Sequence, residues 1–241
     1  MIGAVIDSAG IVAGGVCALA CKKTLPARYQ LAAKLGLGIF TVWLGLGLTW
    51  KSLNGTFTQI LKELGIALLA MLLGKWVGQL LRLQKLSNSI GQYASRALTA
   101  QGGGKRFNDG FLVATGLFCA APLAFLASVQ EGLNSSSFSP VFLIKAGTDG
   151  LATMAFCVTF GWGSLISAIP ALAFQGGIIR SAQWMEPWLS RQPWPLVDSI
   201  NAVNGLLIFC VALIILEIKK VRVADYLPGL VLAPLLTRWL W

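Results

Sequence analysis

The stretch SPVFLIKAGTDGLATMAFCVTFGWG, Ser139 to Gly163, decides the fold class because it is long and apolar enough to cross a bilayer. A helix needs about 20 mostly apolar residues to span about 30 Å of hydrocarbon. Lys145 and Asp149 nevertheless lie near the middle of this stretch, one helical turn apart. Because ionisable groups are costly inside hydrocarbon, such a pair either neutralises itself or faces a polar pathway.

The composition of the whole chain indicates the same class. Of its 241 residues, 56% are hydrophobic and only 12% are charged, and the mean hydropathy is +0.74. Soluble domains usually carry about 25% charged residues. The apolar runs are continuous, which favours helices over the alternating strands of a β-barrel. The sequence therefore predicts an all-α, polytopic helix bundle that forms one membrane domain over residues 1–241.

Eight apolar segments are expected to cross the bilayer. They are 2–21, 30–50, 57–81, 109–130, 140–161, 163–180, 196–217 and 225–240. Basic residues gather in the alternate connections 22–29, 82–108 and 218–224. The positive-inside rule places these connections in the cytoplasm and both termini outside. Between the fifth and sixth segments, GWGSLIS leaves only a tight turn, which indicates that one of the two is broken or re-entrant.

Two connections resemble segments that lie at a membrane surface. Residues 83–100 repeat apolar side chains at helical spacing, which predicts an amphipathic helix at the cytoplasmic interface within the connection 83–108. The outer connection 181–195 carries Trp184, Trp188 and Trp194. Tryptophan favours the headgroup region, so we interpret these residues as an anchoring belt. A stacking platform for an external ligand is the alternative.

Small residues recur four positions apart, at Gly10–Gly14, Gly74–Gly78 and Ala146–Gly150. This spacing lets membrane helices pack closely. There is also a weak internal repeat: IDSAGIVAGG at 6–15 resembles VDSINAVNG at 197–205, each with Asp-Ser and a glycine seven residues after the aspartate. Many transporters are built from such repeats, although two short matches could also arise by chance.

Several kinds of activity are not expected. The chain has no histidine, so it cannot form a Ser-His or Cys-His couple or an HExxH zinc site, and we expect no enzyme activity, metal or other cofactor. The five cysteines lie in apolar segments without a CxxC pair, as buried thiols do. The formal charge of +10 gathers in the three basic connections, a distribution that reflects membrane topology rather than nucleic-acid binding.

The rare polar side chains inside the apolar segments supply a candidate pathway for a solute or ion. Lys145 and Asp149 form its predicted centre. The predicted outer access consists of Asp7, Glu131, Gln175 and a stripe of residues three apart, Asp198, Asn201 and Asn204. Asp109 opens its segment on the cytoplasmic side, where it is either a helix cap or an inner gate. For each of these residues, a structural bond to a neighbour is the alternative.

Longer phrases carry a resemblance to a known family. They are IGAVIDSAGIVAGGV near the start, then FNDGFLVATGLFCAAPLAFLASVQEGL, KAGTDGLATMAFC, SAIPALAFQGG and IKKVRVADYLPGLVLAPLL. With these phrases the chain resembles, over nearly its whole length, the bacterial inner-membrane family catalogued as domain of unknown function 554. The family favours Asn where this chain has Asp7, and Glu where it has Asp109. The resemblance implies an integral inner-membrane protein, often described as a candidate transporter. It implies no substrate and no site residues.

These features together predict a transporter or channel for a small polar or ionic solute, a cation or a zwitterion, in the bacterial inner membrane. Oxygen-rich groups among glycine-broken helices suit such solutes. The alternative is a non-transporting scaffold whose polar groups satisfy one another and whose basic loops dock anionic lipid or a partner protein. The expected partners are the lipid bilayer and the solute, and the glycine-rich faces are compatible with a homo-oligomer.

Overall fold

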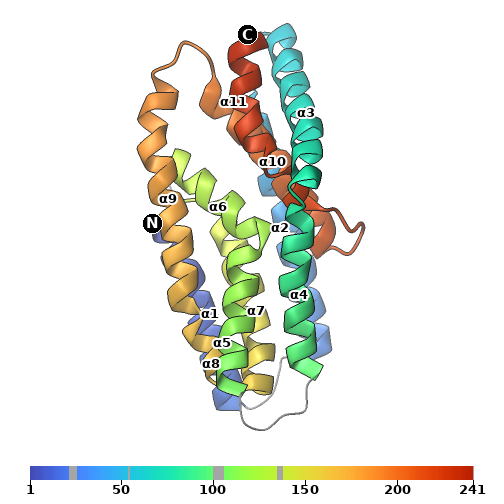
Figure 1. Ribbon diagram of the computed structural model, residues 1–241, viewed down its shortest axis with the longest axis vertical. Coiled ribbons are helices and arrows are strands. Elements are labelled where there is room, and N and C mark those ends of the chain that lie inside the picture. The colour runs from blue at the N-terminus through green and yellow to red at the C-terminus, as the bar shows by residue number, and fades with distance from the viewer. Residues whose placement is uncertain (22–25, 54, 100–105, 135–137, 241) are drawn as a thin grey trace.

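The computed structural model is an elongated bundle of helices (Figure 1). It describes residues 1–21, 26–53, 55–99, 106–134 and 138–240, and these ranges contain no strand. In chain order the elements are α1 (Ile2–Cys21), α2 (Ala27–Ser52), α3 (Phe57–Leu80), α4 (Leu83–Thr99), α5 (Arg106–Ala120), α6 (Pro122–Leu133), α7 (Val141–Phe160), α8 (Gly163–Ile166), α9 (Ala168–Ser190), α10 (Leu196–Ile215), the 3₁₀ turn η1 (Val223–Tyr226) and α11 (Gly229–Leu240). The all-α class is confirmed.

The number of candidate spans is smaller than eight. In the described ranges, five stretches are long and apolar enough to cross a membrane: α1, α2, α7, α8 with α9, and α10. Two bent pairs, α3 with α4 and α5 with α6, raise the number to seven if each pair is one span. The eighth predicted segment corresponds to α11, whose 12 residues extend only about 18 Å at 1.5 Å per residue. That length is too short to cross the hydrocarbon by itself.

The helix breaks lie only partly where the sequence indicated. Gly161, at φ +80, ends α7, and Ser167 then separates the short α8 from α9 within the predicted segment 163–180. The bends lie elsewhere, between α3 and α4, at 64°, and between α5 and α6, at 53°. Pro122 causes the second bend, because it has no N–H to donate to the Phe118 carbonyl.

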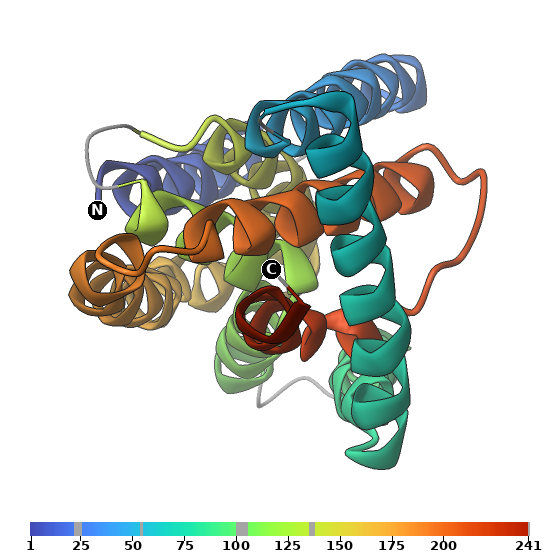
Figure 2. The ribbon, with the colours of Figure 1, turned by 90° about the horizontal axis from the view of Figure 1, so that it is seen from above.

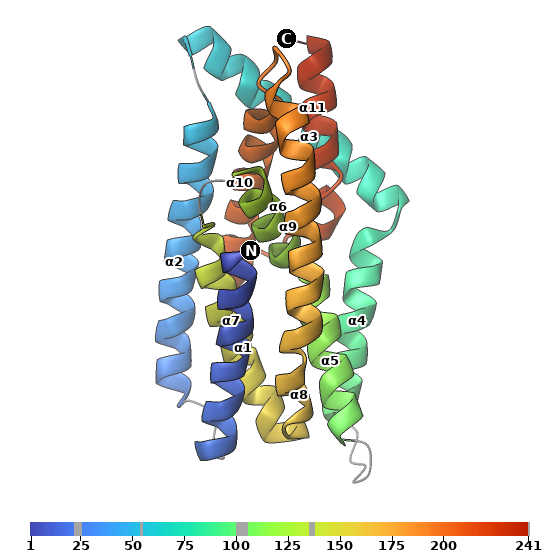
Figure 3. The ribbon, with the colours of Figure 1, turned by 90° about the vertical axis from the view of Figure 1, so that its left-hand side faces the viewer.

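The predicted amphipathic helix is present as α4, but its position differs from the expectation. It runs along the long axis of the bundle beside α5 rather than across one end (Figures 1 and 3). Two contacts hold it there. The Gln84 backbone N–H donates to Asp225 Oδ1 of η1 at 3.0 Å, and Ile90 fills the space left by the missing side chain of Gly116. The predicted connection beyond it falls partly on residues 100–105, outside the described residues.

The predicted outer tryptophan loop is mostly helix. The last turns of α9 continue to Ser190, so only residues 191–195 form the connection. The segment 181–186 favours a helix, and Pro187 removes only one helical hydrogen bond. Trp184 and Trp188 are exposed, whereas Trp194 packs against the core. The anchoring belt therefore stays a prediction, carried by a helix face.

Two helix pairs cross with glycine backbones in contact. At the α1–α7 crossing, a Cβ added to Gly10 would lie 2.7 Å from the Ala146 carbonyl oxygen, and one added to Gly14 would lie 2.7 Å from the Gly150 carbonyl carbon. At the α2–α10 crossing, a Cβ on Gly205 would lie 2.6 Å from the Gly45 carbonyl oxygen. The small-residue spacing thus marks real close approaches.

The arrangement of the helix ends agrees with alternating spans. The end of α1 and the start of α2 lie at one end of the long axis, and the ends of α9 and α11 lie at the other (Figure 3). Seen along this axis, α10 crosses the middle of the bundle between α2 and α11 (Figure 2). Which end faces the cytoplasm stays a prediction from the charges of the connections.

Candidate functional site

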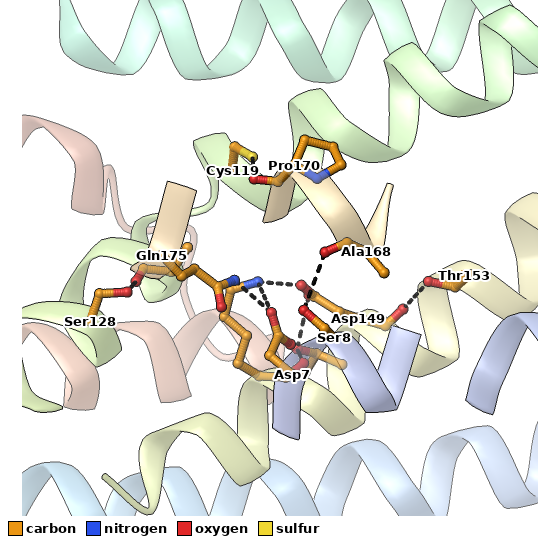
Figure 4. Close-up of polar contacts among 12 residues, drawn as sticks. Asp7, Ser8, Cys119, Ser128, Asp149, Thr153, Ala168, Pro170 and Gln175 are labelled. Atoms are coloured by element: carbon orange, nitrogen blue, oxygen red, sulfur yellow. Dashed lines mark hydrogen bonds and ion pairs between the residues drawn. The ribbon is translucent and has the colours of Figure 1, made fainter. Parts of the chain in front are cut away.

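Three charged side chains meet at the α1–α7 crossing (Figure 4). Lys145 Nζ of α7 forms an ion pair with Asp149 one turn along the same helix, and a second one, at 3.3 Å, with Asp7 Oδ2 of α1. Asp7 and Lys145 are fully buried, and Asp149 is 8% exposed. The predicted centre is therefore larger than an ion pair. Two carboxylates share one ammonium, so the group has a formal charge of −1.

Gln175 of α9 completes this group, which we call the central cluster: Asp7, Lys145, Asp149 and Gln175 (Figure 4). Its Nε2 donates to Asp7 Oδ2 at 2.5 Å. The remaining oxygens of these two side chains, Asp7 Oδ1 and Gln175 Oε1, are buried without a hydrogen-bond partner. Buried acceptors normally have a donor. A proton, a small cation or a buried water molecule would supply what these oxygens lack.

The wall around the cluster comes from α5 and the start of α9. The Phe118 ring centroid lies 5.8 Å from Lys145 Nζ, close enough for a cation–π contact. Ser8 donates to the Ala168 carbonyl at 3.2 Å, which fixes α1 against α9 beside the cluster. Pro122 has no N–H, so it cannot donate the helical hydrogen bond that would continue α5 into α6 beside this wall.

A cavity of about 450 Å³ approaches the cluster from the side of α2 and α10. Thr148 of α7 lines it. The Thr148 hydroxyl donates to the Lys145 carbonyl at 2.9 Å and lies 3.5 Å from Asp149 Oδ1. The cavity therefore reaches a residue that contacts the buried charges. Lys34 and Glu217, which form an ion pair, also line this cavity.

The stripe on α10 does not join the cluster. Asn204 donates to the Leu126 carbonyl of α6 at 3.0 Å, and Asn201 is buried. Asp198 lines a separate polar cavity of about 410 Å³ with Asn134 and Glu186. We expected the stripe and Asp7 to line one outer access. Asp7 contacts Lys145 and Gln175, because α1 crosses α7, and the shared access stays a prediction.

Two further predicted residues have carboxylates near helix starts: Glu131, from the last turn of α6, contacts the start of α1, and Asp109 lies in the first turn of α5. Both carboxylate oxygens of Glu131 accept the Gly3 backbone N–H, at 3.1 and 3.0 Å, in the first turn of α1, where the helix dipole favours a negative charge. Among the described residues no hydrogen bond or ion pair connects either of them to the central cluster. The position of Asp109 agrees with the capping interpretation.

Three residues of the cavity were not predicted: Lys34, Thr148 and Glu217. Lys34 is the single charged residue within the predicted span 30–50, a signal that could have identified it. Thr148 lies between the two residues of the predicted ion pair. Glu217 gave no signal, because its role depends on a backbone turn after α10. No group of three or more His, Cys, Asp or Glu side chains in the described ranges could hold a metal ion.

Comparisons with known proteins agree with the resemblance seen in the sequence. Residues 2–238 match the family model described as Protein of unknown function (DUF554). The chain is 28% identical to the uncharacterized membrane protein YdfK of Bacillus subtilis (strain 168), over 97% of this chain and 94% of that protein. It is 26% identical to the uncharacterized protein YqgA of Escherichia coli (strain K12), over 99% of this chain and 97% of that protein. No solved structure gives a significant match.

Proposed function

The chain belongs to the DUF554 family, and on that premise we propose that it transports a small polar or ionic solute across the membrane, with the central cluster as its cation site. The observation that carries this proposal is the charge imbalance inside the bundle. Asp7 and Asp149 face the single ammonium of Lys145. A buried group with a formal charge of −1 favours the uptake of a proton or a small cation over an anion.

The surroundings of the cluster support a role in transport. Transporters alternate between states that open one site to either side of the membrane. Lys145 and Asp7 are fully buried, which corresponds to a closed site, and the cavity at Thr148 gives the direction from which it could open.

A non-transporting scaffold is the alternative function, and the burial of Lys145 and Asp7 on all sides favours it. A cluster that only holds helices together would satisfy its own polar atoms. Asp7 Oδ1 and Gln175 Oε1 have no partner. Together with the charge imbalance, these two oxygens support transport over the scaffold.

The test uses purified protein in liposomes that contain a pH-sensitive dye, with gradients of protons, Na⁺ or K⁺. We expect the wild type to move a cation faster than empty liposomes do. Asp7→Asn places at this position the amide that the related family favours, so the variant should fold, and it should lose cation movement. Asp109→Asn, with no bond to the cluster, is the matched control and should move cations at the wild-type rate. A wild type that moves no cation would refute the cation site.

A further inference from the structure

A second ionic group lies at the mouth of the cavity that approaches the cluster. Lys34 of α2 forms an ion pair with Glu217, which follows α10, and both side chains line the cavity. Their side chains are 41% and 75% exposed. Exposed ion pairs contribute little to stability, so the fold does not need this one. Thr148, which contacts Asp149 of the central cluster, lines the same cavity.

The backbone at Glu217 is unfavourable for any residue with a side chain. Its φ is +58, in the left-handed region where glycine is usual after a helix. The turn is the ordinary helix-ending type: the Glu217 N–H donates to the Ile214 carbonyl, and the Ile218 N–H donates to the Leu213 carbonyl. Glycine would form the same turn with less strain. The turn therefore does not explain the glutamate.

The charge at this position is also unfavourable. Glu217 directly follows the C-terminal end of α10, where the helix dipole disfavours a carboxylate. Lys34 offsets this cost, since its hydrogen bond and charge lower the pKa of Glu217. The carboxylate is consequently ionised at neutral pH. A residue kept against both backbone and dipole preferences points to a function for its side chain.

The rest of the cavity defines what could bind beside these two charges. Its walls include the apolar side chains of Leu31, Leu37, Leu151, Met154 and Ile215. A volume of about 450 Å³ lies in the range of small-molecule sites. The ligand that fits this lining has one positive charge, one negative charge and a short apolar part.

We propose that Lys34 and Glu217 bind the carboxylate and the ammonium group of a small zwitterion, with its apolar side chain against the cavity wall, as in a neutral amino acid. Without ligand, the two residues neutralise each other. With ligand, each exchanges one charged partner for another, so no charge is left unpaired. The inference rests on the proposed transport function and names its substrate class, and the cavity leads from this site to Thr148 at the central cluster.

The first experiment measures binding of tritiated L-leucine to the whole protein in lipid nanodiscs. Two competitors each lack one charge: 4-methylpentanoate lacks the amine, and isopentylamine lacks the carboxylate. We expect unlabelled leucine to displace the tracer and neither competitor to do so at the same concentration. Displacement by either one as efficiently as by leucine, or no leucine binding, would overturn the zwitterion site.

Variants separate ligand binding from a structural role. Glu217→Gln and Lys34→Gln should each weaken leucine binding by about tenfold, as loss of one charge-assisted hydrogen bond does. Glu186→Gln, at a partly buried glutamate that lines a different cavity, is the matched control. Glu217→Gly removes the backbone strain, so it should melt at a higher temperature and still lose leucine binding. Full binding by Glu217→Gly would overturn the inference.

The cation assay tells the two proposals apart. If the wild type moves a cation in liposomes but binds no leucine, the zwitterion site fails and the cation site stands. If it binds leucine but moves no cation, the zwitterion site stands without cation coupling. If it does neither, both proposals fail.

Discussion

The α1–α7 and α2–α10 crossings are built alike but differ in chemistry. Both bring glycine backbones into contact, and the weak repeat in the sequence aligns Gly14 of the first with Gly205 of the second. At the first crossing lie the buried charges of the central cluster. At the second, Thr49 bonds to the Gly45 carbonyl at 3.0 Å, and no charged side chain is buried there among the described residues. Helices of this kind therefore cross without charges, which argues that the charges at the first crossing serve another purpose.

The largest expected effect comes from removing the one cation at the first crossing. Lys145→Met leaves Asp7 and Asp149 buried beside each other, and breaking a buried charge pair costs about 3–5 kcal/mol. We expect a large fall in the melting temperature of the purified protein. Lys34→Met, which removes an exposed lysine, is the control and should change it little. An unchanged melting temperature in Lys145→Met would mean that water already solvates the cluster.

A smaller loss of stability should follow when a methyl group is added at either crossing, and the loss should be equal at the two crossings. Gly14→Ala and Gly205→Ala each place a methyl group against backbone atoms, and overpacking of this kind costs about 1–3 kcal/mol. The controls are Gly36→Ala and Gly47→Ala, where an added Cβ meets nothing within 4 Å. Those changes should be neutral or slightly stabilising, because alanine favours helices. Melting curves of the four variants would show whether both crossings are equally tight. If only one of Gly14→Ala and Gly205→Ala lowered the melting temperature, the two crossings would not be equivalent.

The smallest effect is the pH dependence of the ion pair beside the second crossing. The pKa of Glu217 in the folded protein lies below its ordinary value of 4.5. The stabilisation is therefore complete above pH 4.5 and is lost as the pH falls through the lower, folded-state pKa. We expect the melting temperature of the wild type to exceed that of Glu217→Gln slightly at pH 6, and the difference to shrink steadily as the pH is lowered below 4.5. A difference that does not shrink as the pH falls would mean that the ion pair is not its source.

Local spacing predicted the part of the site that lies within one helix. Lys145 and Asp149 are one turn apart, and a helix brings such residues together whatever surrounds it. Asp7 could not be assigned in the same way, because its partner depends on which helix α1 crosses. The four-residue spacing at Gly10 and Ala146 predicted close packing for both helices, but not that they pack on each other.

The fold, like the site, could be predicted only where residues close together in the sequence determine it. Hydropathy predicted the apolar segments and the helical class, because both follow from the bilayer as solvent. The direction of α4 was wrong, since contacts with Asp225 and Gly116, far along the chain, determine it. Glu217 was not predicted as a site residue, because the sequence around it does not indicate its conformation. Its importance depends on a positive φ after α10, and nothing in its sequence neighbours indicates that conformation.

The separation of Asp7 and Lys145 along the chain has a consequence for biogenesis. They are 145 − 7 = 138 residues apart. At about 5–20 residues per second, the ribosome needs roughly 7–28 s to synthesise the lysine after the aspartate. Throughout that interval α1, with a mean hydropathy of 1.9, holds a carboxylate whose counter-ion does not yet exist. The carboxylate of Asp7 therefore cannot gain its Lys145 partner until α7 has been synthesised.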